Sequence, residues 1–145
     1  MQVNEYKDLA LRTESSVRSS LEDLGINGYI PDLRHKFRLL HAALGLATEA
    51  GELIDMLKKH IFYGKQIDLL NAQEEIGDSM WYIALASDAV SKLVRLGGWG
   101  VEDRNLEEIM IQNIAKLRAR YPDKFTAECA INRNINNEQE VLKNG

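Results

Sequence analysis

The chain has 145 residues, of which 45% are hydrophobic and 28% are charged, a composition that excludes intrinsic disorder for the bulk of it. Its 18 Lys and Arg against 22 Asp and Glu give a net charge of −4. This balance excludes a global attraction to nucleic acid or to an anionic membrane, so neither is expected as a partner.

Two sequence features bear on localisation. Cys129 is the only cysteine, so no disulfide can form within the chain, and we expect a reducing, cytoplasmic compartment. Residues 1–8 contain acids and no apolar stretch, so a signal peptide is not expected. No apolar run approaches the ~20 residues that a membrane span needs.

Apolar residues recur at steps of three or four in four segments, which predicts four helices. The first segment runs from Val3 to Leu24 and the second from Leu39 to Leu57. The third runs from Leu69 to Val94, and the fourth opens at Glu102 and ends at Pro122. Glycines follow the first three segments, where they are typical of helix ends.

Four helices of this kind, with no segment of alternating polarity, predict an all-α fold that resembles a four-helix bundle. The length fits a single domain, which we place at residues 1–125. Residues 126–145 are polar with sparse apolar positions. We expect them to form a C-terminal arm or short helix that lies on the body and is partly disordered at its end.

Two pairs of acids spaced i, i+3 border the apolar stripes of the second and third segments, Glu49 with Glu52 and Glu75 with Asp78. A short connection favours antiparallel packing of these helices, which lets the two pairs face each other. Four carboxylates together repel and are costly to desolvate unless a cation neutralises them, and such ligands suit Mg²⁺ or Mn²⁺. The alternative is a solvated acidic face, because chance alone produces nearly as many pairs at this spacing.

Other site chemistries lack their motifs. A di-iron carboxylate bundle needs Glu-x-x-His on two helices, and none of the three histidines follows a glutamate at that spacing. The glycines at 97–100 are not followed by the Lys-Ser/Thr of a Walker phosphate loop.

The fourth segment places Asn113, Lys116 and Arg120 on one helical face. We call these three residues the donor row, because an amide, an ammonium and a guanidinium in line suit phosphate oxygens. The alternative is a solvated face with cations near the helix C-terminus. Trp81 could stack on a base, although aromatic residues at helical spacing are more often part of a core.

Together these motifs carry a resemblance. The segment 49–52, Glu-Ala-Gly-Glu, followed by 74–78, Glu-Glu-Ile-Gly-Asp, resembles the Glu-x-x-Glu … Glu-x-x-Asp signature of the MazG-like all-α nucleoside triphosphate pyrophosphohydrolases. The segment 113–122 is similar to that family's nucleotide-contacting region, and the similarity covers the chain to about Phe125.

This resemblance implies a MazG-type fold and hydrolysis of a (deoxy)nucleoside triphosphate to the monophosphate and pyrophosphate, as in nucleotide-pool housecleaning. It implies that Mg²⁺ is held by the catalytic acids Glu49, Glu52, Glu75 and Asp78. We expect the following residues to contact the substrate: Asn113, Lys116, Arg120, Tyr121, Lys59 and Trp81. Lys65 is a further candidate for phosphate binding.

The resemblance also implies a homodimer or a dimer of dimers. The run Ile109-Met110-Ile111 favours association independently, since three successive helical residues cannot all face one interior. Two alternatives stay open at this point: a non-enzymatic helical interaction module, and a metal-dependent phosphoesterase acting on another substrate.

Overall fold

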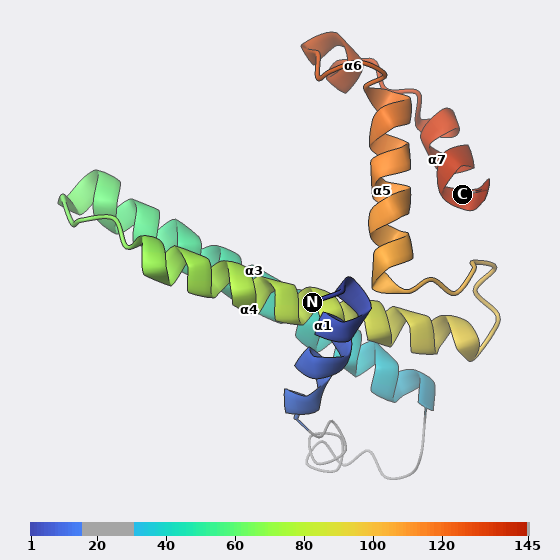
Figure 1. The fold of residues 1–145 in the computed structure, drawn as a ribbon, viewed down its shortest axis with the longest axis horizontal. Helices are drawn as coiled ribbons and strands as arrows, with labels where there is room; N and C mark the ends of the chain where they lie inside the picture. The colour runs from blue at the N-terminus through green and yellow to red at the C-terminus, as the bar shows by residue number, and fades with distance from the viewer. Residues whose placement is uncertain (16–30, 145) are drawn as a thin grey trace.

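The computed structural model describes residues 1–15 and 31–144, and its regular structure is helical (Figure 1). No strand occurs in these two ranges, so the predicted all-α class is confirmed. The elements in chain order are α1 (Val3–Ala10), the 3₁₀ helix η1 (Leu11–Thr13), α3 (Pro31–Tyr63), α4 (Leu69–Arg95), α5 (Leu106–Arg120), α6 (Ala127–Ile131) and α7 (Ile135–Asn144).

Helices α3 and α4 form a long antiparallel hairpin, as the short connection between them predicts (Figure 1). Gly64 turns the chain with a φ of +65°, a conformation that other residues rarely adopt. The His60 Nδ1 atom lies 2.8 Å from the carbonyl oxygen of Lys65 and ties the end of α3 to the loop. Asp68 then caps α4 by accepting a hydrogen bond from the Asn71 backbone N–H.

The buried core lies where α1 and α5 meet this hairpin. Its fully buried residues are Leu85 and three alanines, Ala42, Ala84 and Ala89. These small alanine side chains let the helices approach closely. Leu106, the first residue of α5, is 8% exposed and closes one end of this core.

The first predicted helix is shorter than its apolar spacing indicates. Helix α1 gives way to η1 after Ala10, and Glu14 already has an extended backbone, so a continuous helix to Leu24 is wrong. Residues 16–24 of that prediction lie outside the described ranges. The Trp81 indole N–H donates to Ala10 O at 2.9 Å and to Thr13 Oγ1 at 2.8 Å, which fixes the end of α1 on α4.

Helix α5 stands at a steep angle to the α3–α4 hairpin and packs against α7 (Figure 1). It begins at Leu106 rather than near Glu102, because the Asn105 side chain caps it in a reciprocal capping box with Glu108. The predicted C-terminal arm contains α6 and α7. The α3–α4 hairpin, with α1 packed on α4, and the α5–α7 pair are thus the main units of the described residues, and a four-helix bundle of MazG type stays a prediction.

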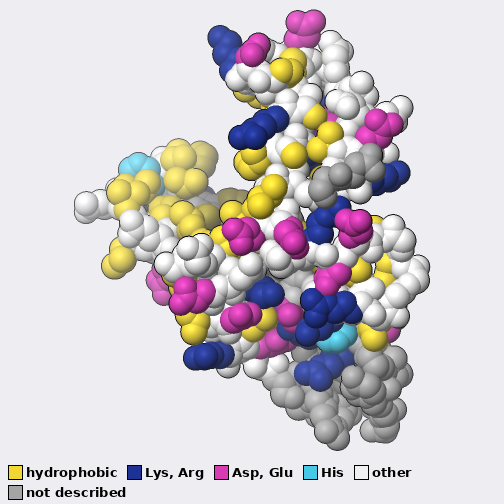
Figure 2. Space-filling view, turned by 45° about the vertical axis from the view of Figure 1, so that its right-hand side comes forward, with side chains coloured by type: hydrophobic (Ala, Val, Ile, Leu, Met, Phe, Trp, Pro, Cys, Tyr) yellow, Lys and Arg dark blue, Asp and Glu magenta, His cyan; other side chains and the backbone are white. Residues whose placement is uncertain are grey.

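Many large apolar side chains are exposed on both hairpins. Figure 2 shows hydrophobic side chains gathered at the projecting end of the α3–α4 hairpin and along α5. Exposed examples are Ile54, Leu57, Ile61, Phe62, Leu69, Leu70, Ile76, Met80, Ile109, Met110, Ile111 and Ile114. Despite this surface, no helix in residues 1–15 and 31–144 has both the length and the apolarity to cross a membrane.

Candidate metal centre

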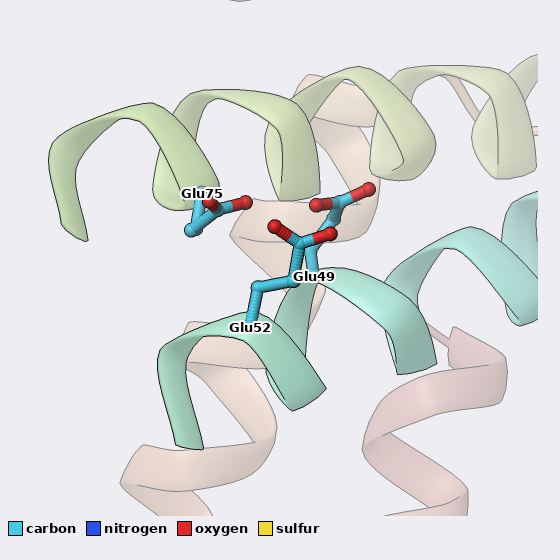
Figure 3. Close-up of side chains that lie close together, drawn as sticks. All are labelled: Glu49, Glu52 and Glu75. Atoms are coloured by element: carbon cyan, nitrogen blue, oxygen red, sulfur yellow. The ribbon is translucent and has the colours of Figure 1, made fainter. Parts of the chain in front are cut away.

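Three glutamates converge between α3 and α4 (Figure 3). Glu49 and Glu52 lie one turn apart on α3, and Glu75 reaches toward them from α4. One carboxylate oxygen from each of the three lies within 4.8 Å of the other two. We call these three residues the glutamate cluster; it confirms that the hairpin brings acids of both predicted pairs together.

The three side chains of the glutamate cluster differ in solvent exposure. Glu75 is 4% exposed, Glu49 is half-buried and Glu52 is exposed. Asn71, one turn earlier on α4, donates from Nδ2 to Glu75 Oε1 at 2.5 Å and so holds the buried carboxylate in place. A carboxylate has two oxygens with several acceptor positions, so this bond leaves Glu75 able to bind a cation.

The carboxylates of the glutamate cluster repel one another, and the pKa values of Glu49 and Glu52 are both raised. Burial, the hydrogen bond with Glu75 and the charges of Glu52, Glu75 and Asp78 raise the pKa of Glu49. The charge of Glu75, followed by burial, raises the pKa of Glu52. The charged groups that cause both shifts are carboxylates, without a cation among them. A bound cation would therefore relieve repulsion that the protein itself leaves unanswered.

Asp78 lies next to the cluster without completing it. Its charge contributes to the raised pKa values of Glu49 and Glu52, and it also raises the pKa of Tyr6, after the larger effect of burial. It is not among the residues whose carboxylate oxygens meet within 4.8 Å. Three of the four predicted metal ligands therefore converge in this structure, and the fourth is an electrostatic neighbour.

Two hollows flank the glutamate cluster. The first, of about 700 Å³, lies toward the α3–α4 loop, and its lining includes Glu52, Asp55, Lys59 and Lys65. We call it the loop hollow. Asp55 pairs there with Lys59 at 2.5 Å and with Lys58 at 2.5 Å. Two of the predicted phosphate-binding lysines thus lie on one side of the cluster.

The second hollow, of about 360 Å³, lies on the other side and is lined by Thr13, Glu49, Asp78, Trp81 and Tyr82. We call it the aromatic hollow. Trp81, a predicted stacking residue, lines it together with Tyr82, and their rings meet edge to face at 5.0 Å between centroids. Thr13 was not among the predicted site residues, because only the fold of the N-terminal segment brings it to α4.

The donor row lies on the other hairpin. Asn113, Lys116 and Arg120 are on α5, and the end that carries Arg120 and Tyr121 points away from the α3–α4 hairpin (Figure 1). Arg120 Nε donates to Glu138 Oε1 at 2.8 Å, and its second nitrogen pairs with Glu138 Oε2. Within the described part of one chain, the row does not join the glutamate cluster.

Comparison with known proteins adds no relative: no family model, no curated protein and no solved structure matches the chain. The resemblance to the MazG-like family therefore stays a prediction that rests on the two acidic segments.

Proposed function

We propose that this protein is a Mg²⁺-dependent nucleoside triphosphate pyrophosphohydrolase, which releases the nucleoside monophosphate and pyrophosphate. The observation that carries the proposal is the glutamate cluster, in which oxygens of Glu49, Glu52 and Glu75 meet within 4.8 Å. The charged groups that raise the pKa values of Glu49 and Glu52 are all carboxylates. The order and spacing of the two acidic segments supply the reaction class, through their resemblance to the MazG-like family.

The donor set fits a hard divalent ion. Octahedral coordination at about 2.1 Å places neighbouring ligand oxygens about 3.0 Å apart and opposite ones about 4.2 Å apart. The 4.8 Å spread of the three carboxylate oxygens is close to these separations. Mn²⁺ prefers the same oxygen ligands, so it is an expected substitute. Asp78 is proposed as a further ligand or as the residue that orients the attacking water.

When bound, the ion supplies charge neutralisation and polarisation of the phosphoryl group. The protein's own residues would place the substrate around it. Among the described residues, no carboxylate forms an ion pair with Lys65, so its ammonium is available to a phosphate oxygen. Lys59 can exchange Asp55 for one. Because Glu52 is the exposed member of the cluster, it is the carboxylate best placed to accept a proton from an incoming water.

A homodimer, or a dimer of dimers, is part of this proposal. Contiguous exposed apolar surface larger than a few hundred Å² marks interaction sites in soluble proteins. Exposed apolar side chains gather along α5 and at the projecting α3–α4 end (Figure 2), and they are the surface that we propose for association. Association through it would offer the Asn113 and Lys116 side chains of one copy a route to the site of another. Arg120 must first leave Glu138 to take part.

The test is product analysis. Purified protein with Mg²⁺ and a panel of ribo- and deoxynucleoside triphosphates should release pyrophosphate, and Glu75→Gln should abolish the release. Glu140→Gln, an exposed glutamate on α7, is the matched control and should keep full activity. Release of orthophosphate would indicate a different phosphoesterase, and no turnover of any nucleotide would favour a non-enzymatic interaction module.

A further inference from the structure

We propose that the aromatic hollow binds the nucleoside half of the substrate, and that Thr13, held in place by the ion pair of Glu14 with Arg38, is a specificity-determining residue. The inference rests on the proposed function, because it orients a nucleoside triphosphate across the glutamate cluster. It also assigns a role to the N-terminal segment, which contains none of the predicted site residues.

The charges on the two sides of the cluster set the direction of the substrate. The loop hollow is lined by two ammonium groups, Lys59 and Lys65, beside the carboxylates of Glu52, Asp55 and Asp68. The lining of the aromatic hollow contains Glu49 and Asp78 with two aromatic rings and, in the described part of the chain, no cation. Phosphate oxygens need cationic partners, and among the lining residues only the loop hollow offers them, so the uncharged nucleoside is the part that fits the aromatic hollow.

The lining of the aromatic hollow favours a ligand that donates hydrogen bonds. Thr13 Oγ1 donates its hydrogen to Ala10 O at 2.8 Å and accepts the Trp81 indole N–H at 2.8 Å. A hydroxyl has two acceptor positions, so Thr13 retains one acceptor and has no donor left. This acceptor suits a sugar hydroxyl or the amino group of a base.

The ion pair beside Thr13 fixes this wall of the hollow. Arg38 is 5% exposed and donates from Nε and a terminal nitrogen to the two Glu14 oxygens at 2.5 and 2.7 Å. Its other terminal nitrogen donates to Asp88 at 2.8 Å, so one guanidinium joins the N-terminal segment to both α3 and α4. Bidentate pairs of this kind restrict geometry as well as adding energy. Glu14 is therefore a positioning residue for Thr13.

Steady-state kinetics test the assignment. Thr13→Val keeps the shape of the side chain and removes the acceptor, and we expect KM for the nucleoside triphosphate to rise about 3- to 10-fold, the loss expected for one hydrogen bond. Inhibition by inorganic tripolyphosphate, which has no nucleoside, should be unchanged. Thr13→Ser should retain the parent KM, and the exposed neighbour Arg12→Gln is the matched control.

Glu14→Gln should act in the same direction as Thr13→Val, raising KM for the nucleotide with little change in kcat, because it loosens the wall and leaves the glutamate cluster intact. A rise in the inhibition constant of tripolyphosphate in Thr13→Val would place the phosphates in the aromatic hollow and overturn the proposal. Unchanged kinetics in both variants would overturn it as well.

A binding measurement separates this proposal from the proposed function. Trp81 and Trp99 are the two tryptophans, so Trp99→Phe leaves Trp81 as the sole indole reporter. Adenosine monophosphate should quench its fluorescence in that background, and Thr13→Val should weaken the effect. Quenching without any triphosphate hydrolysis would keep the subsite and refute the reaction, whereas hydrolysis without quenching would refute the subsite alone.

Discussion

Replacing Gly45 by alanine tests the packing behind the aromatic hollow. A Cβ atom added at Gly45 would lie 2.1 to 2.3 Å from three ring carbons of Tyr82, far inside normal contact. The Tyr82 ring is held between neighbours, with its centroid 5.7 Å from that of His41 and 5.0 Å from that of Trp81. The ring must therefore move by more than an ångström against packed aromatic neighbours.

Gly51→Ala is the matched control, because a Cβ there meets nothing within 4 Å. In a helix interior, alanine is favoured over glycine by about 1 kcal/mol, so Gly51→Ala should stabilise the fold by about that amount. Overpacking commonly destabilises by about 1–3 kcal/mol. Since both variants gain the same helix propensity, the difference in their free energies of unfolding should be about 1–3 kcal/mol, with Gly45→Ala the less stable.

Urea unfolding followed by circular dichroism, with chelator present, measures this difference. If Gly45→Ala proves as stable as Gly51→Ala, the close approach of Tyr82 to α3 is not as described. Displacement of Tyr82 should also raise KM for the nucleotide, since this ring lines the aromatic hollow.

Further predictions concern charge and association. Mg²⁺ should raise the melting temperature of the parent by mass action, and scanning calorimetry should find Glu52→Gln at least as stable as the parent in chelator. That second result follows because neighbouring carboxylates raise the pKa of Glu52 in the folded protein above its ordinary value of 4.5. At a pH above 4.5, the ionisation of Glu52 therefore lowers the stability of the folded state, and glutamine removes this cost. Hydrogen bonds from Arg120 and then Arg133 hold the pKa of Glu138 at about 2, so its stabilising contribution is full above 4.5 and is lost as the pH falls toward 2. Acid titrations of unfolding should therefore be less steep over that interval in Glu138→Gln. Light scattering at micromolar concentration should show a dimer or larger species, and Ile111→Glu, at an exposed position on α5, should shift it toward monomer.

Helices α3, α4 and α5 and the meeting of the acids were predictable because they follow from local rules, whereas the first predicted helix was too long. Apolar spacing of three and four marks the cores of α3, α4 and α5, and glycine marks the turn between the first two. A short turn imposes antiparallel packing, so the sequence alone predicts that Glu49 and Glu75 face each other. Asp78 lies outside the glutamate cluster. The register of two packed helices depends on side-chain packing, which the spacing of residues along the sequence does not predict.

The parts that the sequence does not predict depend on contacts between distant residues. Arg38 joins Glu14 and Asp88 across 24 and 50 positions, and nothing in its own neighbourhood indicates either partner. The pairing of Arg120 with Glu138 could not be predicted either. The sequence pattern of a helical row of donors is the same whether its cations bind phosphate or a buried glutamate. The steep angle between α5 and the α3–α4 hairpin likewise cannot be predicted from apolar periodicity.

Isothermal titration of the chelator-treated protein with Mn²⁺ tests the central claim most directly, because it asks whether the glutamate cluster binds a divalent ion, independently of any substrate. We expect saturable binding to the parent and to Glu140→Gln, and affinity weaker by about tenfold or more in Glu75→Gln, whose buried oxygen faces the other two ligands. Equal Mn²⁺ affinity in Glu75→Gln and the parent, or no binding to the parent, would contradict the metal centre and the function built on it.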